Sequence, residues 1–541
     1  MAGPAPLNVA FVWHMHQPYY RDPLSGEHML PWVLLHGTKD YLHMAEVLAQ
    51  FPKLHMTFNL VPCLVQQVLD YADNQASSRF LRICSTPPER LSEDDKSYIL
   101  SFFFSINYDK VISRYPRYQE LVRERHEQGE HSDEFWADTI GWFNLAWIDP
   151  TLIEHDAELK TLTQRPHFSA ADLACIRAKQ RDILGQIVPA YRRLHRAGQA
   201  ELSTSPFFHP VLPLIIDNHG ATQESTPYVS LPTHRYRHPE DAVEQVRRAR
   251  VAHREFFGHY PTGMWPSEGG VSQDIIYPLA QAGMRWTATD EEILNRSRGW
   301  SSRRPDGTVW DPGSLYSAYK VQDEDRSLAV LFRDRGLSDD IGFRYQNWRP
   351  EDAARDLVGH LHGIRDALGK SRGEHIVPLI LDGENCWEFY DNNGTDFLVA
   401  LYTLLSEDET LRCVTVSEFL DEHPPTQTLE YLAAGSWIGG TFDVWIGELA
   451  QNVAWDYLER TREDLVRWET ECEGAEIEVL ERAWEEIYIA EGSDWFWWYY
   501  SGNEPSLERG FDRQFRQHLI NIYTLMGSPV PDYLREPILK G

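Results

Sequence analysis

Two acidic residues in this sequence stand at the ends of apolar runs. Glu268 lies in segment 263–269 (GMWPSEG), and Asp382 closes the run 378–382 (PLILD), in the most apolar stretch of the chain. A carboxylate at the end of a buried strand is where a β/α-barrel enzyme keeps its catalytic groups. Two facing carboxyls are also the minimum needed to cleave a glycosidic bond. We therefore expect Glu268 and Asp382 to be catalytic.

The local setting of each carboxyl indicates a role. Asp382 lies beside apolar residues and other acids, which disfavour its ionised form and suit a general acid. Glu268 suits a nucleophile at a strand end. In an alternative interpretation, Ser267 and Glu268 begin the helix expected through residues 273–276, and the acid is merely a helix-capping group. The two carboxyls together are more specific than either one alone.

A pair of histidines follows the first apolar run. His14 and His16 are two residues apart, so in a strand they share one face. Their position at a strand end favours hydrogen bonding to a sugar. Two alternatives stay open: two structural histidines, or a metal site, which needs a third ligand such as a strand-end acid.

The overall composition narrows the classes of partner. The 541 residues carry a net charge of −31, which argues against nucleic acid and anionic membranes as partners. The charge fits a neutral substrate, or simply a solvated acidic surface. The 19 Trp and 25 Tyr residues suit sugar binding, because flat rings with a polar edge stack on the apolar faces of a pyranose.

The cysteines and the N-terminus predict the cellular setting. None of the six cysteines forms a CxxC pair, so a zinc knuckle is not expected. Residues 1–7 (MAGPAPL) lack a basic segment and a long apolar stretch, so no signal peptide is expected. No apolar run approaches the ~18 residues of a membrane span. We expect a cytoplasmic protein with free thiols.

The elements that must position these groups can be read from the apolar runs. Seven strands are predicted, at 8–13, 56–60, 200–204, 262–265, 285–289, 328–332 and 376–381. Long helical or irregular stretches separate them, which indicates a parallel β/α architecture. The polar residues at the strand ends are His14, His16, Asn59, Ser205, Glu268, Asp290, Arg333, Asp334 and Asp382. A closed or nearly closed barrel would direct all of them toward one mouth.

Two helical regions are expected around the strands. The gap of about 63–199 is too long for a loop and predicts a helical insertion, with Ser169 as a helix N-cap. Residues 350–369 predict a further helix, with proline and acids in its first turn. We expect a catalytic barrel over 1–420 that contains the insertion, and a C-terminal helical domain over 421–541 that contributes to the active-site cleft.

The chain resembles glycoside hydrolase family 57, which is marked by five motifs. The matching segments here are 16–18 (HQP), 198–202 (GQAEL), 265–269 (WPSEG), 381–385 (LDGEN) and 490–498 (AEGSDWFWW). All five occur in order and span nearly the whole chain. One such motif would be weak, but five in order make the resemblance specific. The WPSEG and GSDWFWW forms look most like the amylopullulanase and α-amylase branch.

The resemblance implies an α/β fold, an incomplete seven-stranded (β/α)7 barrel followed by a helical domain. It also implies α-glucan substrates such as glycogen, starch or maltodextrin, and a retaining mechanism. We expect no metal and no other cofactor, because neither the histidine spacing nor the cysteines supply a complete zinc site. By motif, Glu268 would be the nucleophile and Asp382 the acid/base. The residues expected to line the sugar subsites are His14, His16, Glu201, Trp265, Asp494 and Trp497.

Three alternatives differ in reaction class. A 4-α-glucanotransferase or a glucan branching enzyme would use the same site but pass the sugar to an acceptor hydroxyl instead of water. A metal-dependent polysaccharide deacetylase or α-mannosidase would use His14, His16 and an acid as ligands. A non-catalytic glucan-binding module would have no need for two costly acids in an apolar mouth. The sequence makes no prediction of oligomeric state.

Overall fold

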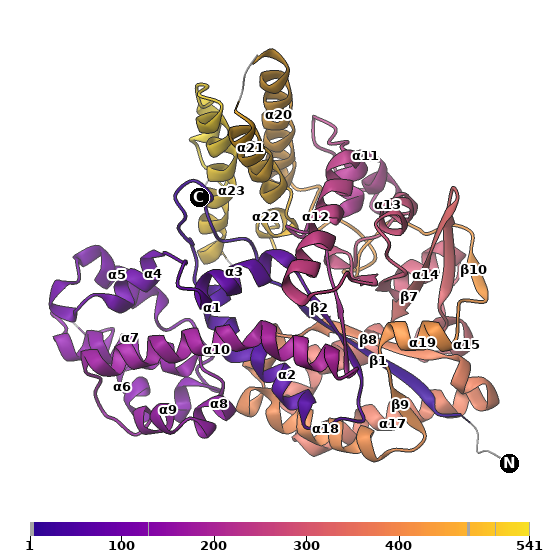
Figure 1. Ribbon diagram of the computed structural model, residues 1–541, viewed down its shortest axis with the longest axis horizontal. Coiled ribbons are helices and arrows are strands. Elements are labelled where there is room, and N and C mark those ends of the chain that lie inside the picture. Colours follow the sequence, from indigo (N-terminus) through magenta and orange to yellow (C-terminus); the bar gives the residue numbers. More distant parts are fainter. Residues whose placement is uncertain (1–4, 128, 473–475, 504, 540–541) are drawn as a thin grey trace.

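A parallel barrel lies at the centre of the computed structural model, which describes residues 5–127, 129–472, 476–503 and 505–539 (Figure 1). Seven strands form it: β1 (Leu7–Met15), β2 (Met56–Leu60), β3 (Ala200–Ser203), β4 (Gly263–Met264), β5 (Trp286–Asp290), β7 (Arg326–Arg333) and β8 (Ile376–Asp382). Each corresponds to a predicted strand. Most are buried along their whole length, as expected for strands covered on both faces.

The barrel is assembled from two curved sheets. One has the order β3-β2-β1-β8, and the other contains β7-β5-β4, with neighbours parallel within these runs. A parallel bridge between Thr204 and Met264 joins β3 to β4. On the other side the Asp334 N–H donates to the Pro378 carbonyl at 2.9 Å and joins β7 to β8. The predicted (β/α)7 barrel is confirmed.

The described residues contain three further strands, which were not predicted. β6 (Tyr319–Asp323) runs antiparallel to β7, β9 (Leu411–Cys413) pairs with the start of β1, and β10 (Gln427–Leu429) pairs with β6. Two of them have only three residues, and β6 alternates buried and exposed positions. Runs this short carry too little periodicity to be recognised in a sequence.

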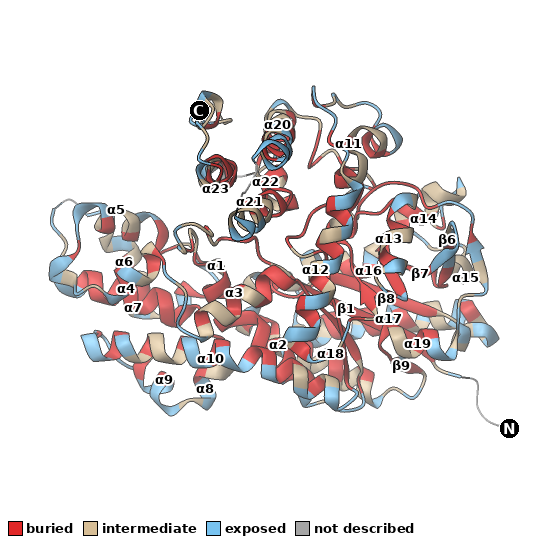
Figure 2. Cartoon of the chain, turned by 45° about the horizontal axis from the view of Figure 1, so that its top comes forward, coloured by how far each residue is buried: buried red, intermediate tan, exposed pale blue. Residues whose placement is uncertain are grey.

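Small and branched side chains fill the barrel interior. Val12, Ala288, Leu331 and Ile380 belong to one buried cluster there. Helix α19 (Val416–Glu422) adds Phe419 and Leu420 to the same cluster and closes the amino-terminal end of the barrel. Figure 2 shows buried residues along the strands and on the helix sides that face them. The packed interior leaves the carboxyl ends of the strands as the place for a site.

The predicted helical insertion lies between β2 and β3, at the left of Figure 1. Its longer helices are α3 (Pro62–Ala72), α5 (Glu93–Phe102), α6 (Pro116–Glu124), α7 (Asp133–Ala146) and α10 (Ala170–Arg196). At the start of α10, the Ser169 hydroxyl accepts the Asp172 N–H and the Asp172 carboxyl accepts the Ser169 N–H. This capping box agrees with the N-cap predicted at Ser169. Helix α17 (Pro350–Leu368) likewise matches the helix predicted at 350–369.

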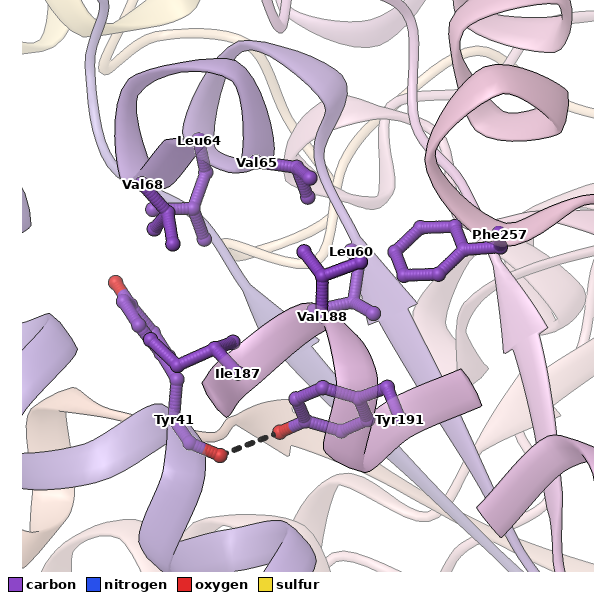
Figure 3. A pocket seen from close by; sticks show the side chains of 9 residues that line it. All are labelled: Tyr41, Leu60, Leu64, Val65, Val68, Ile187, Val188, Tyr191 and Phe257. Atoms are coloured by element: carbon purple, nitrogen blue, oxygen red, sulfur yellow. Dashed lines mark hydrogen bonds between the residues drawn. The ribbon is translucent and has the colours of Figure 1, made fainter. Parts of the chain in front are cut away.

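A small apolar cavity lies between side chains of α3 and α10 near the end of β2 (Figure 3). Leu60, Val65 and Ile187 are among its lining residues, and the Tyr191 hydroxyl donates to the Tyr41 carbonyl at 2.8 Å. The lining holds no charged side chain. It is a gap in helix packing and lacks the convergent polar groups of a ligand site.

The C-terminal helices stand over the barrel mouth, at the top of Figure 1. They are α20 (Leu449–Glu471), α21 (Ile477–Ala490), α22 (Ser493–Trp498) and α23 (Pro505–Leu525). The chain between α19 and α20 still packs on the barrel, because it contains β10 and a loop that bonds to Glu268. Among the described residues, no helix is both long and apolar enough to cross a membrane.

Candidate active site

The strand register brings the polar strand-end residues to one level. In β1, His14 lies opposite Asn59 of β2 on one side and Asp382 of β8 on the other. The His14 Nδ1 and Asn59 Oδ1 atoms are 2.7 Å apart, and the Ser205 hydroxyl donates to the same Asn59 oxygen at 2.9 Å. Parallel strands end at the same edge, so groups distant in sequence meet at this mouth.

Glu268 lies just beyond β4 in a short turn, Ser267–Gly269, with a φ of 60°. This left-handed conformation is uncommon for a residue with a side chain and is typical of functional positions. The Trp437 N–H donates to the Glu268 carbonyl at 3.0 Å and helps to hold the turn. The next helical turn has Ser272 at its N-cap position, and the carboxyl of Glu268 is engaged elsewhere. The contacts of Glu268 therefore do not support the alternative interpretation as a helix-capping residue.

Two donors hold the Glu268 carboxyl. The Ser493 hydroxyl donates to Oε1 at 2.9 Å, and the Trp437 indole N–H donates to Oε2 at 3.3 Å. Burial, together with the negative charges of Asp494 and Asp382, raises the pKa of Glu268 to about 7 against the opposing effects of His16 and Ser493. Glu268 follows β4 and Asp382 ends β8, so both predicted catalytic carboxyls lie at the carboxyl end of the barrel.

Asp382 closes β8 at the same mouth. Burial raises the pKa of its carboxyl, while the Asn385 amide, which donates to Oδ2 at 3.2 Å, and the charges of His16 and Arg333 oppose the rise. A raised pKa shifts a carboxyl toward its protonated form, which is the direction that a general acid needs. Asp382 thus has the property expected of the general acid.

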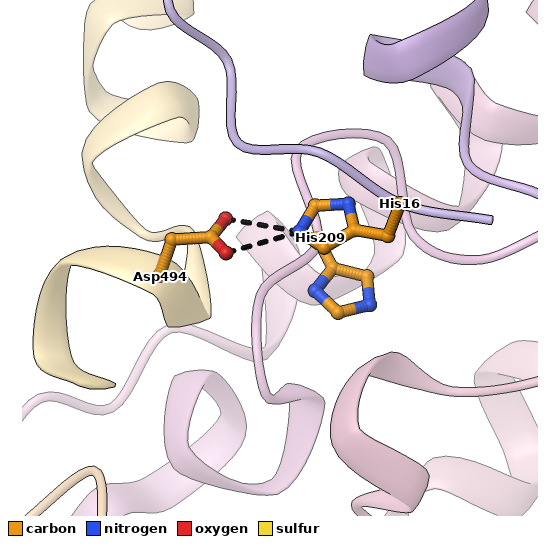
Figure 4. Close-up of side chains that lie close together, drawn as sticks. All are labelled: His16, His209 and Asp494. Atoms are coloured by element: carbon orange, nitrogen blue, oxygen red, sulfur yellow. Dashed lines mark hydrogen bonds and ion pairs between the residues drawn. The ribbon is translucent and has the colours of Figure 1, made fainter. Parts of the chain in front are cut away.

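An ion pair joins the first strand to the C-terminal helices (Figure 4). His16 Nε2 lies 3.0 Å and 3.1 Å from the two carboxylate oxygens of Asp494, in α22. Burial opposes a charge on His16, but the charge and hydrogen bonds of Asp494, with a contribution from Cys63, raise its pKa well above the usual value. The ring of His209 stacks on that of His16 at 3.7 Å. Burial lowers the pKa of His209 well below its usual value, so a cation lies on a neutral ring.

The residues His16, His209 and Asp494 lie close enough together to suggest a metal site. A metal bound to imidazole lies in the plane of the ring, about 2.0–2.1 Å from the nitrogen in the case of zinc. The two rings here are stacked and inclined by only 21°. Their planes therefore meet far beyond that bond length, and the two histidines cannot ligate one ion without rearranging.

Trp265 and Trp497 occupy different settings. The Trp265 ring is completely buried and packs against Trp437 at 5.3 Å, edge to face, with His14 beyond at 6.4 Å. It supports the wall of the site from behind rather than presenting a face to a sugar. Trp497 is half-buried on α22, one turn beyond Asp494, with its ring 6.0 Å from that of Trp445.

Glu201 lies away from the mouth, and its position corrects the expectation that it lines a sugar subsite. It is the second residue of β3, toward the amino-terminal end of the barrel. Its carboxyl accepts hydrogen bonds from Thr262 Oγ1 at 2.9 Å, Trp286 Nε1 at 2.8 Å, and both the backbone N–H and the hydroxyl of Ser417 at 2.9 and 2.7 Å. These donors tie the barrel to α19. The Glu201 carboxyl thus stabilises the amino-terminal end of the barrel, and both of its oxygens are already engaged by protein donors.

The site also contains residues that the sequence did not single out. Trp437, Ser493 and His209 surround Glu268; His209 Nδ1 is 3.0 Å from the Ser493 hydroxyl. Ser493 lies in segment 490–498, which resembles a family motif, so the sequence does contain a signal for this residue. His209 has a φ of 59° and Trp437 lies 169 residues from Glu268, and neither shows a local pattern. Glu384, also in a motif, is buried and accepts the His16 N–H at 3.0 Å.

Comparison with known proteins gives several relatives. A putative α-amylase of Methanocaldococcus jannaschii is 25% identical over 232 residues, which is 40% of this chain and 44% of that protein. The chain thus spans less than half the length of this curated relative. A branching enzyme of Thermococcus kodakaraensis is 16% identical with a TM-score of 0.62, covering 96% of this chain and 90% of that one. The α-amylase AmyC of Thermotoga maritima is 15% identical with a TM-score of 0.59, covering 98% and 96%. At such low identity the structures show a shared fold.

The family itself is shown by sequence. The model of glycosyl hydrolase family 57 matches residues 10–432, most of the chain, and includes both strand-end carboxyls. With the barrel, its mouth and this match in place, the chain belongs to glycosyl hydrolase family 57.

Proposed function

We propose that the protein cleaves α-1,4 bonds of α-glucans, and α-1,6 bonds as a second specificity, by a retaining double displacement. The observation that carries this proposal is the pair Glu268 and Asp382: Glu268 follows β4 and is held by Ser493 and Trp437, and Asp382 ends β8 opposite His14 at the same mouth. Family membership and the name of the Methanocaldococcus jannaschii relative, a putative α-amylase, support the substrate class. Substrate contacts by His14, His16, Asp494 and Trp497 are part of the same proposal.

In the first step, Asp382 donates its proton to the glycosidic oxygen, and Glu268 attacks the anomeric carbon as the bond to the leaving sugar breaks. Glu268 must be ionised to attack. A pKa of about 7 leaves it partly ionised at neutral pH in the empty cleft. The Trp437 indole N–H can only donate a hydrogen bond, so it stabilises the ionised Glu268 carboxylate. The positive charge on His16 has the same effect. Positive charge developing at the anomeric carbon adds to this effect.

In the second step, Asp382 acts as a base. It takes a proton from water, which attacks the glycosyl–enzyme ester, releases the sugar and frees Glu268. A sugar hydroxyl in place of water would give transfer instead of hydrolysis. A 4-α-glucanotransferase or branching activity is therefore the second candidate, supported by the branching enzyme of the same fold. A metal-dependent deacetylase or mannosidase is disfavoured, because His16 and His209 are stacked and His14 is bonded to Asn59.

Product analysis on amylose, pullulan and maltotriose tests the proposal. A hydrolase should shorten amylose to small maltooligosaccharides with a matching gain of reducing ends. Release of maltotriose from pullulan would add α-1,6 cleavage. Products longer than maltotriose, formed from maltotriose without new reducing ends, would identify a transferase. Lack of any change in these three substrates, with Glu268→Gln as the inactive control, would refute an α-glucan-active enzyme.

A further inference from the structure

A pair of exposed tryptophans lies on a loop that is anchored at the carboxyl ends of β5 and β7. Trp300 and Trp310 are in loop 299–311, between α14 (Glu291–Arg298) and α15 (Pro312–Leu315), at the right of Figure 1. The two residues are 36% and 50% exposed. The ring centroids are 5.4 Å apart and the planes are inclined by 45°. An exposed aromatic ring loses the free energy that burial of its apolar surface would give. Two such rings side by side on one loop therefore indicate an interaction site.

The loop holds both rings in fixed positions. The Trp310 indole N–H donates to the Ser301 carbonyl at 2.9 Å, which sets the plane of that ring. The Arg298 guanidinium lies over the Trp300 ring, 3.6 Å from its centroid. An antiparallel bridge between Arg303 and Val309 closes the loop between the two tryptophans. The pair is preorganised, so binding would cost little ordering entropy.

The loop is also anchored to the barrel. Arg303 makes ion pairs with Glu291 at 2.6 Å and with Asp334 at 2.8 Å, where β5 and β7 end. Both carboxylates are buried. The tryptophan pair is thus rigidly connected to the scaffold that carries the catalytic groups, although Glu268 and Asp382 come from other strands, β4 and β8.

We propose that the Trp300–Trp310 pair is a surface binding site for an α-glucan chain, separate from the catalytic cleft. The inference rests on the proposed function for its substrate class. Sugar rings present apolar faces to aromatic side chains and hydroxyls to the polar residues around them. Here the exposed residues of the loop include the polar Arg304, Asp306 and Thr308. Two inclined rings fit a curved α-linked chain better than a flat ribbon.

The other classes of occupant fit less well. Two tryptophans bury roughly 300–500 Å² when fully covered, whereas a stable protein partner needs about 800 Å² per side. A polyanion would be repelled by the net charge of −31. A neutral, hydroxyl-rich polymer meets neither objection. Such a site would keep a polymeric substrate near the enzyme and raise its effective concentration at the mouth.

Native electrophoresis in gels that contain amylopectin tests the site, with Glu268→Gln as the background so that no polymer is degraded. Trp300→Ala and Trp310→Ala are compared with Tyr260→Ala. Tyr260 is a matched control: it is 38% exposed, it is covered by Arg250 at 3.7 Å, and it precedes β4 at the other end of the barrel. Trp310→Phe, which keeps a ring, guards against simple misfolding of the loop, and thermal melting checks each variant.

Each tryptophan variant should weaken retention by amylopectin about tenfold, as loss of one stacking contact predicts. Tyr260→Ala should migrate as the parent, and Trp310→Phe should keep part of the retention. In the active protein, Trp300→Ala should lower the rate on amylopectin but leave the rate on maltotriose unchanged. Equal retention of all variants, or no retention of a parent whose wild type degrades amylopectin, would overturn the surface site while the proposed function stands. A wild type inactive on every α-glucan would instead refute the proposed function.

Discussion

Replacing Glu268 by Gln should abolish activity and, at alkaline pH, stabilise the fold. The pKa of Glu268 is raised from 4.5 to about 7, chiefly by burial. Between these two values the folded protein binds a proton that the unfolded chain does not, so the stability of the wild type falls as the pH rises from about 4.5 to about 7. At higher pH the full cost of the buried charge remains. Gln carries no charge and escapes this cost.

The magnitude follows from the size of the shift. Each pKa unit corresponds to 1.36 kcal/mol, so the ionised carboxyl costs the fold about 3 kcal/mol. The side chain is 15% exposed, which reduces this figure. Gln has one acceptor oxygen for two donors, Ser493 and Trp437, and loses a hydrogen bond worth ~1 kcal/mol. We therefore expect Glu268→Gln to gain about 2 kcal/mol or less near pH 9 and nothing, or a small loss, near pH 4.5.

Chemical denaturation of the wild type and the variant near pH 4.5, 7 and 9 measures this difference. Glu201→Gln is the matched control, because that buried carboxyl is fully used by protein donors. It should destabilise the protein near pH 9, where Glu268→Gln stabilises it. A stability difference for Glu268→Gln that does not change with pH, or a loss near pH 9, would refute the argument that the functional carboxyl is held at a cost to the fold.

Asp382→Asn and Glu268→Gln should each lower activity by several orders of magnitude with the fold intact, and the double variant should be little worse; a single variant that keeps more than about a tenth of wild-type activity, ~1.4 kcal/mol, contradicts its role. NMR in the first minutes should show the α-anomer released first, and a β-anomer would exclude Glu268 as nucleophile. Activity should survive exhaustive chelation; loss with recovery on added zinc would restore the metal alternative that includes His16. Asp494→Ala should lower kcat/KM by more than its loss of stability explains, with the melting temperature as the measure of stability. A loss of melting temperature that accounts for the loss of activity would make the ion pair with His16 purely structural.

The sequence alone determined the scaffold and the chemistry at the strand ends. The seven barrel strands were predictable from short apolar, β-rich runs, several of which are nearly continuously apolar, as expected of strands buried on both faces. Glu268 and Asp382 were predictable because each ends such a run. Helix α10 and its cap at Ser169 were visible for a similar reason, since a capping box needs only four neighbouring residues.

What only the tertiary structure decided is where each strand-end or motif residue faces. Glu201 and Asp494 both lie in segments that resemble family motifs. Glu201 is nevertheless bonded near the amino-terminal end of the barrel, whereas Asp494 pairs with His16 at the mouth. The position of a residue along its strand decides whether it lies at the mouth or at the amino-terminal end of the barrel, and a sequence motif alone does not indicate this position. Trp437 and His209 reach Glu268 from loops far away in the sequence. Such contacts arise when separate chain segments close over the barrel, and no local period or propensity encodes them.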